Sequence, residues 1–332
     1  MISTVIPVFN EAASLEQLHA ELDDVARSYD EEFEIIFVDD GSTDGSWHVI
    51  QQLAERDSRV RGIRFRRNFG KAAALSAGFE MSKGTLVFTL DADLQDDPQE
   101  IPRFLAVMQE DDLDVVSGWK QLRHDPWHKV IPSRIFNWLV SWMTGVKLHD
   151  HNCGFKCYRR EIFSEVRLYG ELHRFVPVLA AARGFRVGEL VVNHRPRAHG
   201  RSKYGWMRIP KGFLDLLTVK FLTGFGQRPQ HVLGTIGLLC FFTGATGLTI
   251  LSAMWIVTRL PLWEGDVVHL TDRAIFFYSV VAFLVGAQFM SIGFIAELIT
   301  AYQGSQVPPY SVVEYIKMRQ SDQASRGQSE NE

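Results

Sequence analysis

The sequence predicts an α/β domain followed by a helical hairpin that crosses a membrane. From the N-terminus to about residue 120, apolar runs typical of buried strands alternate with segments of helical periodicity. Polar turns follow these strands, as in α/β proteins that bind ligands at the carboxyl ends of their strands. Two runs without any charged residue lie in the last third of the chain, and each is long enough to cross a bilayer.

The first strand is expected over residues 3–8, and it breaks into a polar loop that ends at Glu11. Ser14 could cap the helix that follows. Three leucines at helical spacing predict the inner face of this helix, and they are Leu15, Leu18 and Leu22.

A second strand is expected over residues 34–38, and the turn over 39–46 follows it. Asp and Gly suit a tight turn, and Asp44 or Ser46 suits the N-cap of the next helix. A third strand over residues 60–65 runs through a basic segment into an alanine-rich helix over 72–81. The alternation of strands and helices is typical of nucleotide-binding α/β proteins.

The most informative segment follows a fourth predicted strand, over residues 85–89. Asp91 and Asp93 are one residue apart at the exit of this strand, where their carboxylates can converge on one hard cation such as Mg²⁺ or Mn²⁺. A bare Asp-x-Asp mostly marks a turn or a helix cap, but the position at a strand exit favours a metal site. Asp97 is expected only to cap the helix that Pro98 opens.

Four segments occur in order along the first domain, and they are IPVFNE (6–11), VDDGSTDGS (38–46), RNFGKAAALSAGFE (67–80) and LDADLQDDP (90–98). In order and spacing they resemble the signatures of family 2 glycosyltransferases with a GT-A fold. The closest resemblance is to the polyprenyl-phosphate glycosyltransferases, which include bactoprenol glucosyltransferases and dolichyl-phosphate mannose synthases. It covers residues 1–203 in detail and implies a GT-A nucleotide-diphospho-sugar transferase domain with a Rossmann-like mixed sheet.

This resemblance implies a donor site with a divalent ion, Mg²⁺ or Mn²⁺, that neutralises the diphosphate leaving group as a Lewis acid. Asp93 is expected as a direct ligand, Asp91 as a ligand of the metal or of the donor, and Gln95 as a third oxygen ligand. Lys71 could approach the diphosphate, and a solvated lysine at a helix start is an equal alternative. Asp40, Ser42 and Asp44 carry less weight because turn chemistry also explains them. The expected donor-binding residues are Pro7, Phe9, Glu11, Asp39, Lys71, Asp91 and Ala92.

Basic residues after a fifth predicted strand, over 114–118, indicate the acceptor side. Cationic side chains near a membrane would hold a lipid phosphate, although each alone is more often a plain surface charge. The family commonly shows Arg where Lys120 stands. The loop over 199–205 resembles the family's G-x-S-K-(Y/F) element. The expected acceptor ligands are Lys120, Arg123, Arg134, Arg201, Ser202 and Lys203.

The segment over 150–160 resembles the family's D-x-x-x-G-F-x-x-Y-R-R element. Asp150 matches the carboxylate that is often proposed as general base, and it is expected as a catalytic residue together with Asp93. A lipid phosphate is already ionised near neutral pH, so Asp150 could instead orient the sugar or basic partners. The resemblance implies inversion at the anomeric carbon.

The composition excludes several other classes of protein. A net charge of −4 argues against a nucleic-acid partner. Three cysteines, Cys153, Cys157 and Cys240, are too few for a disulfide framework and lack partners for a zinc site. Reduced cysteines in a cytosolic compartment are therefore expected.

The C-terminal part divides into a linker over 204–230, a hairpin over 231–301 and a tail over 302–332 whose end is expected to be disordered. The predicted spans cover about 232–257 and 274–298. The linker reads as an amphipathic helix in the membrane interface. The stripe Ile135, Trp138, Leu139, Trp142 and Met143 suits either a core-facing or an interfacial helix.

The orientation follows from the charges beside the spans. No signal peptide precedes Pro7, and Lys and Arg flank the outer ends of both spans. We therefore expect a multi-pass protein of the inner (cytoplasmic) membrane with its catalytic domain and both termini in the cytoplasm.

The expected reaction is inverting transfer of a monosaccharide from a nucleotide-diphosphate sugar to a polyprenyl phosphate, with UDP-glucose and undecaprenyl phosphate favoured. A GDP-mannose-dependent mannose synthase is the alternative, and a non-catalytic membrane scaffold is another. A processive synthase would show a Gln-x-x-Arg-Trp motif and more spans, and the sequence has neither. A homo-oligomer and a lipid-sugar flippase are further partners that the resemblance leaves open.

Overall fold

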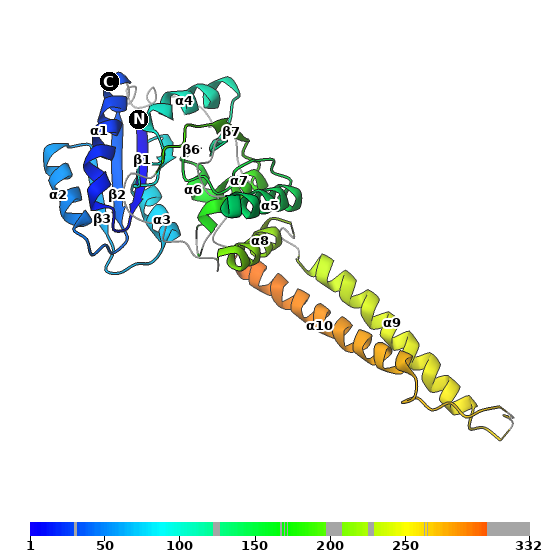
Figure 1. The fold of residues 1–332 in the computed structure, drawn as a ribbon. Helices are drawn as coiled ribbons and strands as arrows, with labels where there is room; N and C mark the ends of the chain where they lie inside the picture. The colour runs from blue at the N-terminus through cyan, green and yellow to red at the C-terminus, as the bar shows by residue number, and fades with distance from the viewer. Residues whose placement is uncertain are drawn as a thin grey trace, which may run out of the picture.

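The computed structural model describes residues 1–29, 32–121, 127–166, 168, 170, 172–196, 208–224, 229–261, 263 and 265–303. An α/β domain lies at one end of the molecule, and two long helices run away from it as a hairpin (Figure 1). The predicted tail beyond residue 303 lies outside the described residues.

A seven-stranded mixed sheet forms the centre of the α/β domain, with the strand order β3-β2-β1-β4-β6-β5-β7. Only β6 runs antiparallel to its neighbours, β4 and β5, and the other neighbouring strands pair in parallel. The predicted strands are confirmed to within one or two residues. The strands are β1 Ile2–Val8, β2 Phe33–Asp39, β3 Val60–Arg64, β4 Leu86–Thr89, β5 Val115–Trp119, β6 Lys156–Arg159 and β7 Val187–Val191.

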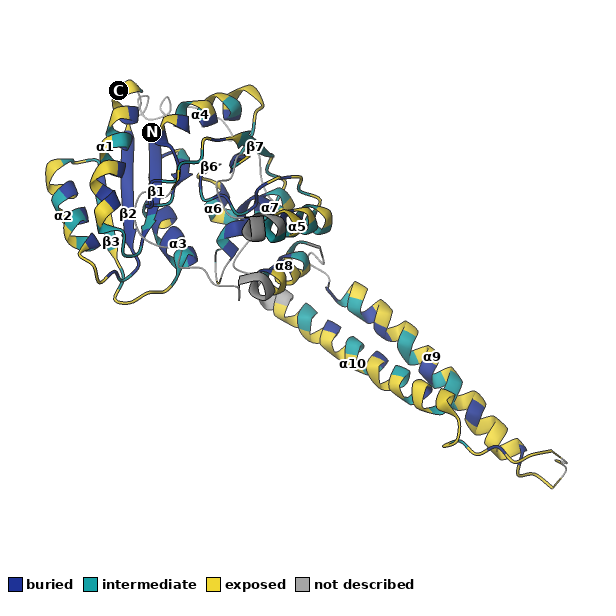
Figure 2. Cartoon of the chain, viewed as in Figure 1, coloured by how far each residue is buried: buried dark blue, intermediate teal, exposed yellow. Residues whose placement is uncertain are grey.

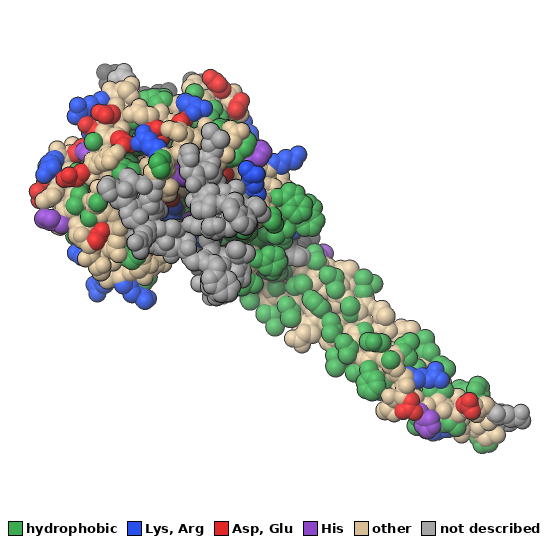
Figure 3. Space-filling view, in the orientation of Figure 1, with side chains coloured by type: hydrophobic (Ala, Val, Ile, Leu, Met, Phe, Trp, Pro, Cys, Tyr) green, Lys and Arg blue, Asp and Glu red, His purple; other side chains and the backbone are tan. Residues whose placement is uncertain are grey.

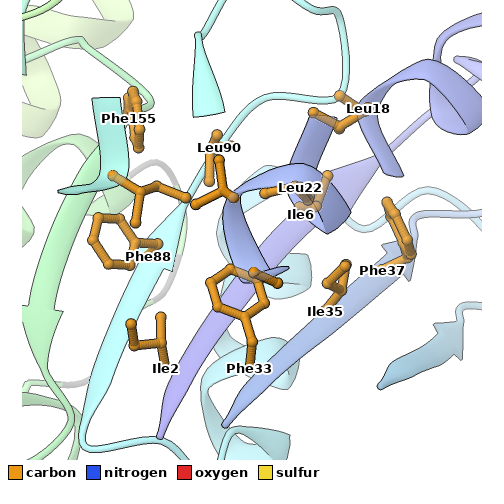
Figure 4. Close-up of a cluster of buried hydrophobic side chains, with 14 of the residues drawn as sticks. Ile2, Ile6, Leu18, Leu22, Phe33, Ile35, Phe37, Phe88, Leu90 and Phe155 are labelled. Atoms are coloured by element: carbon orange, nitrogen blue, oxygen red, sulfur yellow. The ribbon is translucent and has the colours of Figure 1, made fainter. Parts of the chain in front are cut away.

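Helices cover both faces of this sheet because its strands alternate apolar residues toward each face. The predicted inner face of α1, with Leu15, Leu18 and Leu22, is buried against strand residues such as Ile6 and Phe37 (Figure 4). The helices are α1 Ala12–Ser28, α2 Ser46–Arg56, α3 Lys71–Met81, α4 Ile101–Glu110, α5 Trp127–Thr144, α6 Ile162–Glu165, α7 Val176–Ala182, α8 Arg208–Gly224, α9 Pro229–Val257 and α10 Ala274–Gln303, with the 3₁₀ turns η1 Pro98–Glu100 and η2 Leu172–Phe175.

The starts of α1 and α2 correct two predictions. Ser14 does not cap α1, because its hydroxyl lies 2.5 Å from the carbonyl oxygen of Ala92 and joins α1 to the loop after β4. The carboxylate of Asp44 accepts a hydrogen bond from the first amide of this helix, at Ala12 (3.1 Å). The N-cap of α2 is Gly45, neither Asp44 nor Ser46, since the turn needs a residue with φ of 92° there.

The predicted capping role of Asp97 is confirmed, since its carboxylate accepts a hydrogen bond from the amide of Gln99 (3.1 Å). Pro98 opens a 3₁₀ turn rather than the α-helix itself, and α4 follows directly from Ile101.

Helices α9 and α10 are long and apolar enough to cross a membrane, as the sequence predicts. Their side chains are mostly exposed, which sets them apart from the buried helices of a soluble domain (Figure 2). Glycines let the two backbones meet, since a Cβ atom on Gly244 would lie 2.3 Å from the nitrogen of Phe283. The carboxylate of Glu297 accepts a hydrogen bond from the amide of Gln230 (3.2 Å) at the start of α9. The hairpin surface is largely apolar along its length, and charged side chains gather at its tip (Figure 3).

Helices α5 and α8 pack together between the sheet and the hairpin (Figure 1). Val140 of α5 and Leu216 and Val219 of α8 share one buried cluster. Packing divides the stripe on α5, because Leu139 and Met143 pack on that cluster while Ile135, Trp138 and Trp142 are exposed. Exposed large apolar residues are Ile135, Trp138 and Trp142 on α5 and Phe213, Leu214, Leu217, Phe221 and Leu222 on α8.

Candidate active site

The loops that follow β1, β2 and β4 carry most of the predicted donor site. Pairing of Val8 with Asp39 and of Val5 with Thr89 places the ends of these three parallel strands side by side. The loops after them therefore meet at one edge of the sheet, where α/β proteins bind their ligands.

Hydrogen bonds join the first two loops directly. The amide of Asn10 donates to the hydroxyl of Ser42 (2.9 Å), and the amide of Thr43 donates to the side-chain oxygen of Asn10 (2.8 Å). The amide of Glu11 donates to the hydroxyl of Ser46 (3.0 Å). Asn10 has a positive φ of 54°, which places its side chain for this contact. The predicted donor residues Phe9 and Glu11 thus lie on a loop whose position depends on the loop after β2.

Asp39 ends β2 and Asp40 follows it, and both residues are buried. Asp39 accepts a hydrogen bond from the amide of Ser42 (3.0 Å), and Arg64 lies 3.6 Å from its carboxylate. Asp40 accepts from the amides of Phe69 (2.6 Å) and Gly70 (2.9 Å). Burial raises the pKa of Asp40 above its usual value, and these two amides act in the opposite direction. Asp40 therefore fixes the loop that carries Lys71, a role beyond the turn chemistry considered in the sequence.

The Asp-x-Asp segment follows β4 in a tight loop. Asp93 is buried, and its carboxylate accepts a hydrogen bond from the amide of Gln95 (3.2 Å). Leu94 between them has a positive φ of 62°, which is costly for a branched residue and is a form of strain found at functional sites. Ala92 is buried, and its carbonyl receives the hydroxyl of Ser14.

Asp91 is more accessible than Asp93 and forms an ion pair with Lys71. Burial acts to raise the pKa of Asp91, but the positive charges of Lys71 and Lys120 prevail and lower it. Gly154 lies against the same carboxylate, since a Cβ atom there would be 2.7 Å from an Asp91 oxygen. The hydroxyl of Thr89 donates to the carbonyl of Gly154 (2.7 Å). The segment around Asp150 is thus in contact with the Asp-x-Asp loop.

Lys120, an expected phosphate ligand, reaches into the same region. Its ammonium lies 2.8 Å from the carboxylate of buried Asp96, which also accepts a hydrogen bond from the amide of Asp91 (3.2 Å). Burial acts to lower the pKa of Lys120, but the charge of Asp96, the hydrogen bond to it and the other negative charges nearby together outweigh burial and raise the pKa. The side chain of Lys120 therefore stays protonated beside the Asp-x-Asp loop.

The structure describes only one of the other expected acceptor ligands. Arg134 is exposed on α5. Arg123, Arg201, Ser202 and Lys203 lie outside the described residues.

Asp150 is buried, and its carboxylate accepts a hydrogen bond from the amide of Asn152 (3.1 Å). The neighbouring His151 is fully buried, and burial followed by the charge of Lys156 lowers its pKa to about 4. His151 is therefore neutral at pH 7. Lys156, at the start of β6, is buried and donates to the carbonyls of His151 (3.3 Å) and Cys153. Burial lowers the pKa of Lys156.

Sequence reasoning missed several groups around these loops. His173 of η2 lies close enough to Lys71 and Asp91 to interact with them electrostatically, and the charge of the next residue, Arg174, acts on His173. Burial, followed by the charge of Lys71, lowers the pKa of His173 well below its usual value. Arg195 binds the carboxylates of Asp97 (2.6 Å) and Glu21 (2.7 Å), and its amide donates to the carbonyl of Gln95 (3.0 Å). For His173 and Arg174, the only local signal in the sequence is a His-Arg pair ahead of an apolar segment.

The donor set of the Asp-x-Asp loop fits a hard divalent ion. Asp91 and Asp93 offer carboxylate oxygens, and Gln95 is half-buried on the same loop. The part of the chain that the structure describes has no group of three or more His, Cys, Asp or Glu side chains set to hold a metal. Two carboxylates suit an ion such as Mg²⁺, which completes its coordination with substrate phosphates and water.

Known proteins resemble the chain over most of its length. The model of "Glycosyl transferase family 2" matches residues 3–167. The chain is 36% identical over 317 residues to the dodecaprenyl-phosphate galacturonate synthase of Rhizobium johnstonii, covering 94% of this chain and 91% of that protein. It is 37% identical over 304 residues to the undecaprenyl-phosphate 4-deoxy-4-formamido-L-arabinose transferase of Aeromonas hydrophila, covering 90% and 88%.

Solved structures share the fold of the α/β domain. Glucosyl-3-phosphoglycerate synthase from Mycobacterium tuberculosis, in complex with Mn²⁺, UDP-glucose and phosphoglyceric acid, superposes with a TM-score of 0.53 at 18% identity, covering 66% of this chain and 79% of that one. Mannosyl-3-phosphoglycerate synthase from Rubrobacter xylanophilus gives 0.52 at 17% identity, covering 67% and 74%. The predicted GT-A fold is confirmed.

Proposed function

The chain belongs to glycosyl transferase family 2, with polyprenyl-phosphate sugar transferases among its relatives, and from that premise we propose that it glycosylates a polyprenyl phosphate with inversion. In this reaction an oxygen of the lipid phosphate attacks the anomeric carbon of a nucleotide-diphosphate sugar. The bond from that carbon to the diphosphate oxygen breaks, and the nucleoside diphosphate leaves. The product is a lipid-phosphate sugar for glycosylation of the cell envelope.

The observation that carries the proposal is the contact between the Asp-x-Asp loop and the Asp150 segment, through Asp91 and Gly154. This contact brings the residues expected for the donor diphosphate against those expected for the sugar and acceptor. Transfer requires both reactants in one place, because fixing their relative position removes much of the barrier of a bimolecular step.

Asp91, Asp93 and Gln95 would hold the divalent ion. When bound, this ion supplies Lewis acidity that offsets the charge of the diphosphate. The Mn²⁺ in the M. tuberculosis neighbour's complex supports the use of such an ion in this fold.

The residues of the chain have distinct roles in this proposal. Lys71 binds the diphosphate, since its ammonium lies beside Asp91 at the start of α3. Asp150 orients the sugar or the acceptor, because a phosphate that is already ionised needs little proton removal. Lys120 adds positive charge for an anionic reactant. Pro7, Phe9, Glu11 and Asp39 remain the expected contacts of the nucleotide.

The sequence motifs favour UDP-glucose as donor and undecaprenyl phosphate as acceptor. The names of the two relatives instead carry galacturonate and 4-deoxy-4-formamido-L-arabinose, on dodecaprenyl and undecaprenyl phosphate. We retain UDP-glucose as the proposed donor, and UDP-galacturonate, UDP-4-deoxy-4-formamido-L-arabinose and GDP-mannose as the competing donors that an assay must include.

The hairpin α9–α10 would anchor the enzyme in the bilayer, with the exposed apolar faces of α5 and α8 against the membrane surface. Basic residues at the outer ends of the spans favour a cytoplasmic catalytic domain by the positive-inside rule. Three points stay predictions: the location in the inner membrane, a homo-oligomeric state, and a lipid-sugar flippase as partner.

The test is transfer of labelled sugar from each of the four donors to undecaprenyl phosphate by the purified chain, with Mn²⁺ or with a chelator. We expect transfer from UDP-glucose that needs the ion and is lost in Asp93→Ala. Asp111→Ala, an exposed acid at the end of α4, is the matched control and should keep full activity. Transfer from another donor alone would correct the sugar, and undiminished transfer by Asp93→Ala would refute the metal assignment.

A further inference from the structure

Helix α5 presents two chemically different faces. Ile135, Trp138 and Trp142 are 60%, 65% and 71% exposed, and they recur at helical spacing. Asn137 and Ser141 lie between them in sequence and point the other way, because Asn137 is 4% exposed and Ser141 contacts the Asp150 segment. One helix therefore joins an apolar outer surface to the interior of the site.

Asn137 holds the Asp150 segment at two points. Its side-chain amide donates to the carbonyl of His149 (2.8 Å), and its oxygen accepts from the side chain of Asn152 (3.3 Å). These contacts lie on either side of Asp150. A buried amide with both ends engaged fixes the backbone more firmly than a single contact does.

Ser141, one turn further along α5, holds the next points. Its hydroxyl donates to the carbonyl of Leu148 (3.1 Å) and lies 3.1 Å from Nε2 of His151. His151 is neutral, so a proton on Nε2 can be donated to the serine oxygen while the serine proton goes to Leu148. The two residues that flank Asp150 therefore both contact α5: His149 contacts Asn137, and His151 contacts Ser141.

From this arrangement, and resting on the proposed function, we infer that Asn137 and Ser141 are positioning residues that set the place of Asp150 for the transfer reaction. They act from a helix whose opposite face is suited to the membrane surface, since tryptophan is enriched there. Lys156 braces the Asp150 segment from β6.

The test compares Asn137→Ala and Ser141→Ala with Thr144→Ala in the full-length chain in nanodiscs. Thr144 lies on the same helix, but its hydroxyl donates to Val140 of α5 itself, so it is a matched control. We expect kcat for transfer to undecaprenyl phosphate to fall about 10- to 100-fold in the first two variants, as for a reactive group that is slightly misplaced. The Kd for the nucleoside diphosphate with Mn²⁺ and the activity of Thr144→Ala should stay within about twofold of wild type.

Hydrogen exchange of the peptide over residues 148–153 provides a second measurement that needs no substrate. We expect its amides to exchange about tenfold faster in Asn137→Ala and Ser141→Ala but not in Thr144→Ala, because lost tethers lower the free energy of local opening. Unchanged exchange, or faster exchange with unchanged kcat, would overturn the inference. An equal loss of nucleotide affinity would also overturn it, since this would indicate general destabilisation. If wild type transfers no sugar while the exchange result holds, the proposed function fails instead.

Discussion

The ammonium of Lys71 forms an ion pair with the carboxylate of Asp91, the first acid of the Asp-x-Asp segment. The lysine is therefore a counter-charge for a residue that is expected to hold a cation. Two cations cannot occupy one carboxylate without cost, so the lysine competes with a metal that arrives alone. When a diphosphate arrives as well, the same lysine gains an anionic partner of its own.

Lys71→Met should shift two binding constants in opposite directions. Affinity for Mn²⁺ without nucleotide should rise about threefold to tenfold, because a competing charge is removed. Affinity for UDP at saturating Mn²⁺ should fall about tenfold, because a charge-assisted hydrogen bond is lost. Electron paramagnetic resonance of free Mn²⁺ measures the first constant and calorimetry the second. Lys83→Met, at an exposed site, is the control, and shifts of the same sign would contradict the argument.

Gly154→Ala should damage the site while sparing the fold. The new Cβ atom would lie 2.7 Å from a carboxylate oxygen of Asp91, so that side chain must move. We expect affinity for Mn²⁺ with UDP, and the rate of transfer, to fall at least about tenfold, with unfolding free energy lowered by about 1 kcal/mol.

Gly84→Ala is the informative contrast to this variant. Its Cβ atom would meet the backbone nitrogen of Ser3 at 2.7 Å, and backbone cannot rotate away as a side chain can. Gly84→Ala should therefore lower the melting temperature more than Gly154→Ala and leave the metal affinity of the folded fraction unchanged. A reversed ranking in thermal unfolding would refute this reading of the two glycines.

The sequence could predict the Asp-x-Asp segment because its signal is local: an apolar strand, then two acids. It could not predict that Asp40 holds Gly70 across 30 residues, or that Ser14 reaches Ala92 across 78. Those contacts depend on which strand ends lie side by side in the order β3-β2-β1-β4. Local propensity carries no information about strand order, so for short polar residues near helix starts the sequence predicts only a role as caps.

The two alternatives for the α5 stripe could not be separated for a similar reason. Apolar residues at helical spacing serve a core or a membrane surface equally well. Packing against α8 divides the stripe, burying Leu139 and Met143 partly and leaving Trp138 and Trp142 exposed. Asn137 and Ser141 were missed because a polar residue within a helix normally indicates its solvent side.

His151 should make the folded chain less stable in mild acid. Its pKa is lowered to about 4 by burial and by Lys156, with Asp150 acting weakly in the opposite direction. In the unfolded chain the pKa of His151 is near 6.5, so in mild acid the unfolded chain binds a proton at this residue that the folded chain does not bind. The contribution of neutral His151 is therefore complete above about pH 6.5 and is lost as the pH falls toward 4, by about 2 kcal/mol between pH 7 and pH 5.

Denaturant unfolding of wild type and His151→Asn at the two pH values checks this expectation. Asparagine can still donate to the Ser141 hydroxyl, but it does not titrate. The difference in unfolding free energy between wild type and variant should shrink by about 2 kcal/mol on going from pH 7 to pH 5. A difference that is independent of pH would show that His151 is charged or solvated in the folded chain.

Removal of the hairpin should affect the acceptor more than the donor. A chain that ends at Gly224 keeps the α/β domain, which holds the described site residues, together with α8, and loses α9 and α10. Its Kd for UDP with Mn²⁺ should stay within about twofold of the full chain, because no donor residue lies in the hairpin. Its KM for undecaprenyl phosphate in vesicles should rise about tenfold or more, because anchoring raises the local concentration of enzyme at the lipid.

A short-chain, water-soluble polyprenyl phosphate separates anchoring from folding in this experiment. Anchoring gives no advantage toward a dissolved acceptor, so both chains should use it with similar KM. If the truncated chain instead loses activity equally toward both acceptors, the hairpin supports the fold of the catalytic domain rather than its access to the membrane. The exposed Trp138, Trp142 and Phe213 remain in the truncated chain. Residual binding to vesicles would therefore measure what α5 and α8 contribute on their own, and replacing both tryptophans with serine should remove most of it.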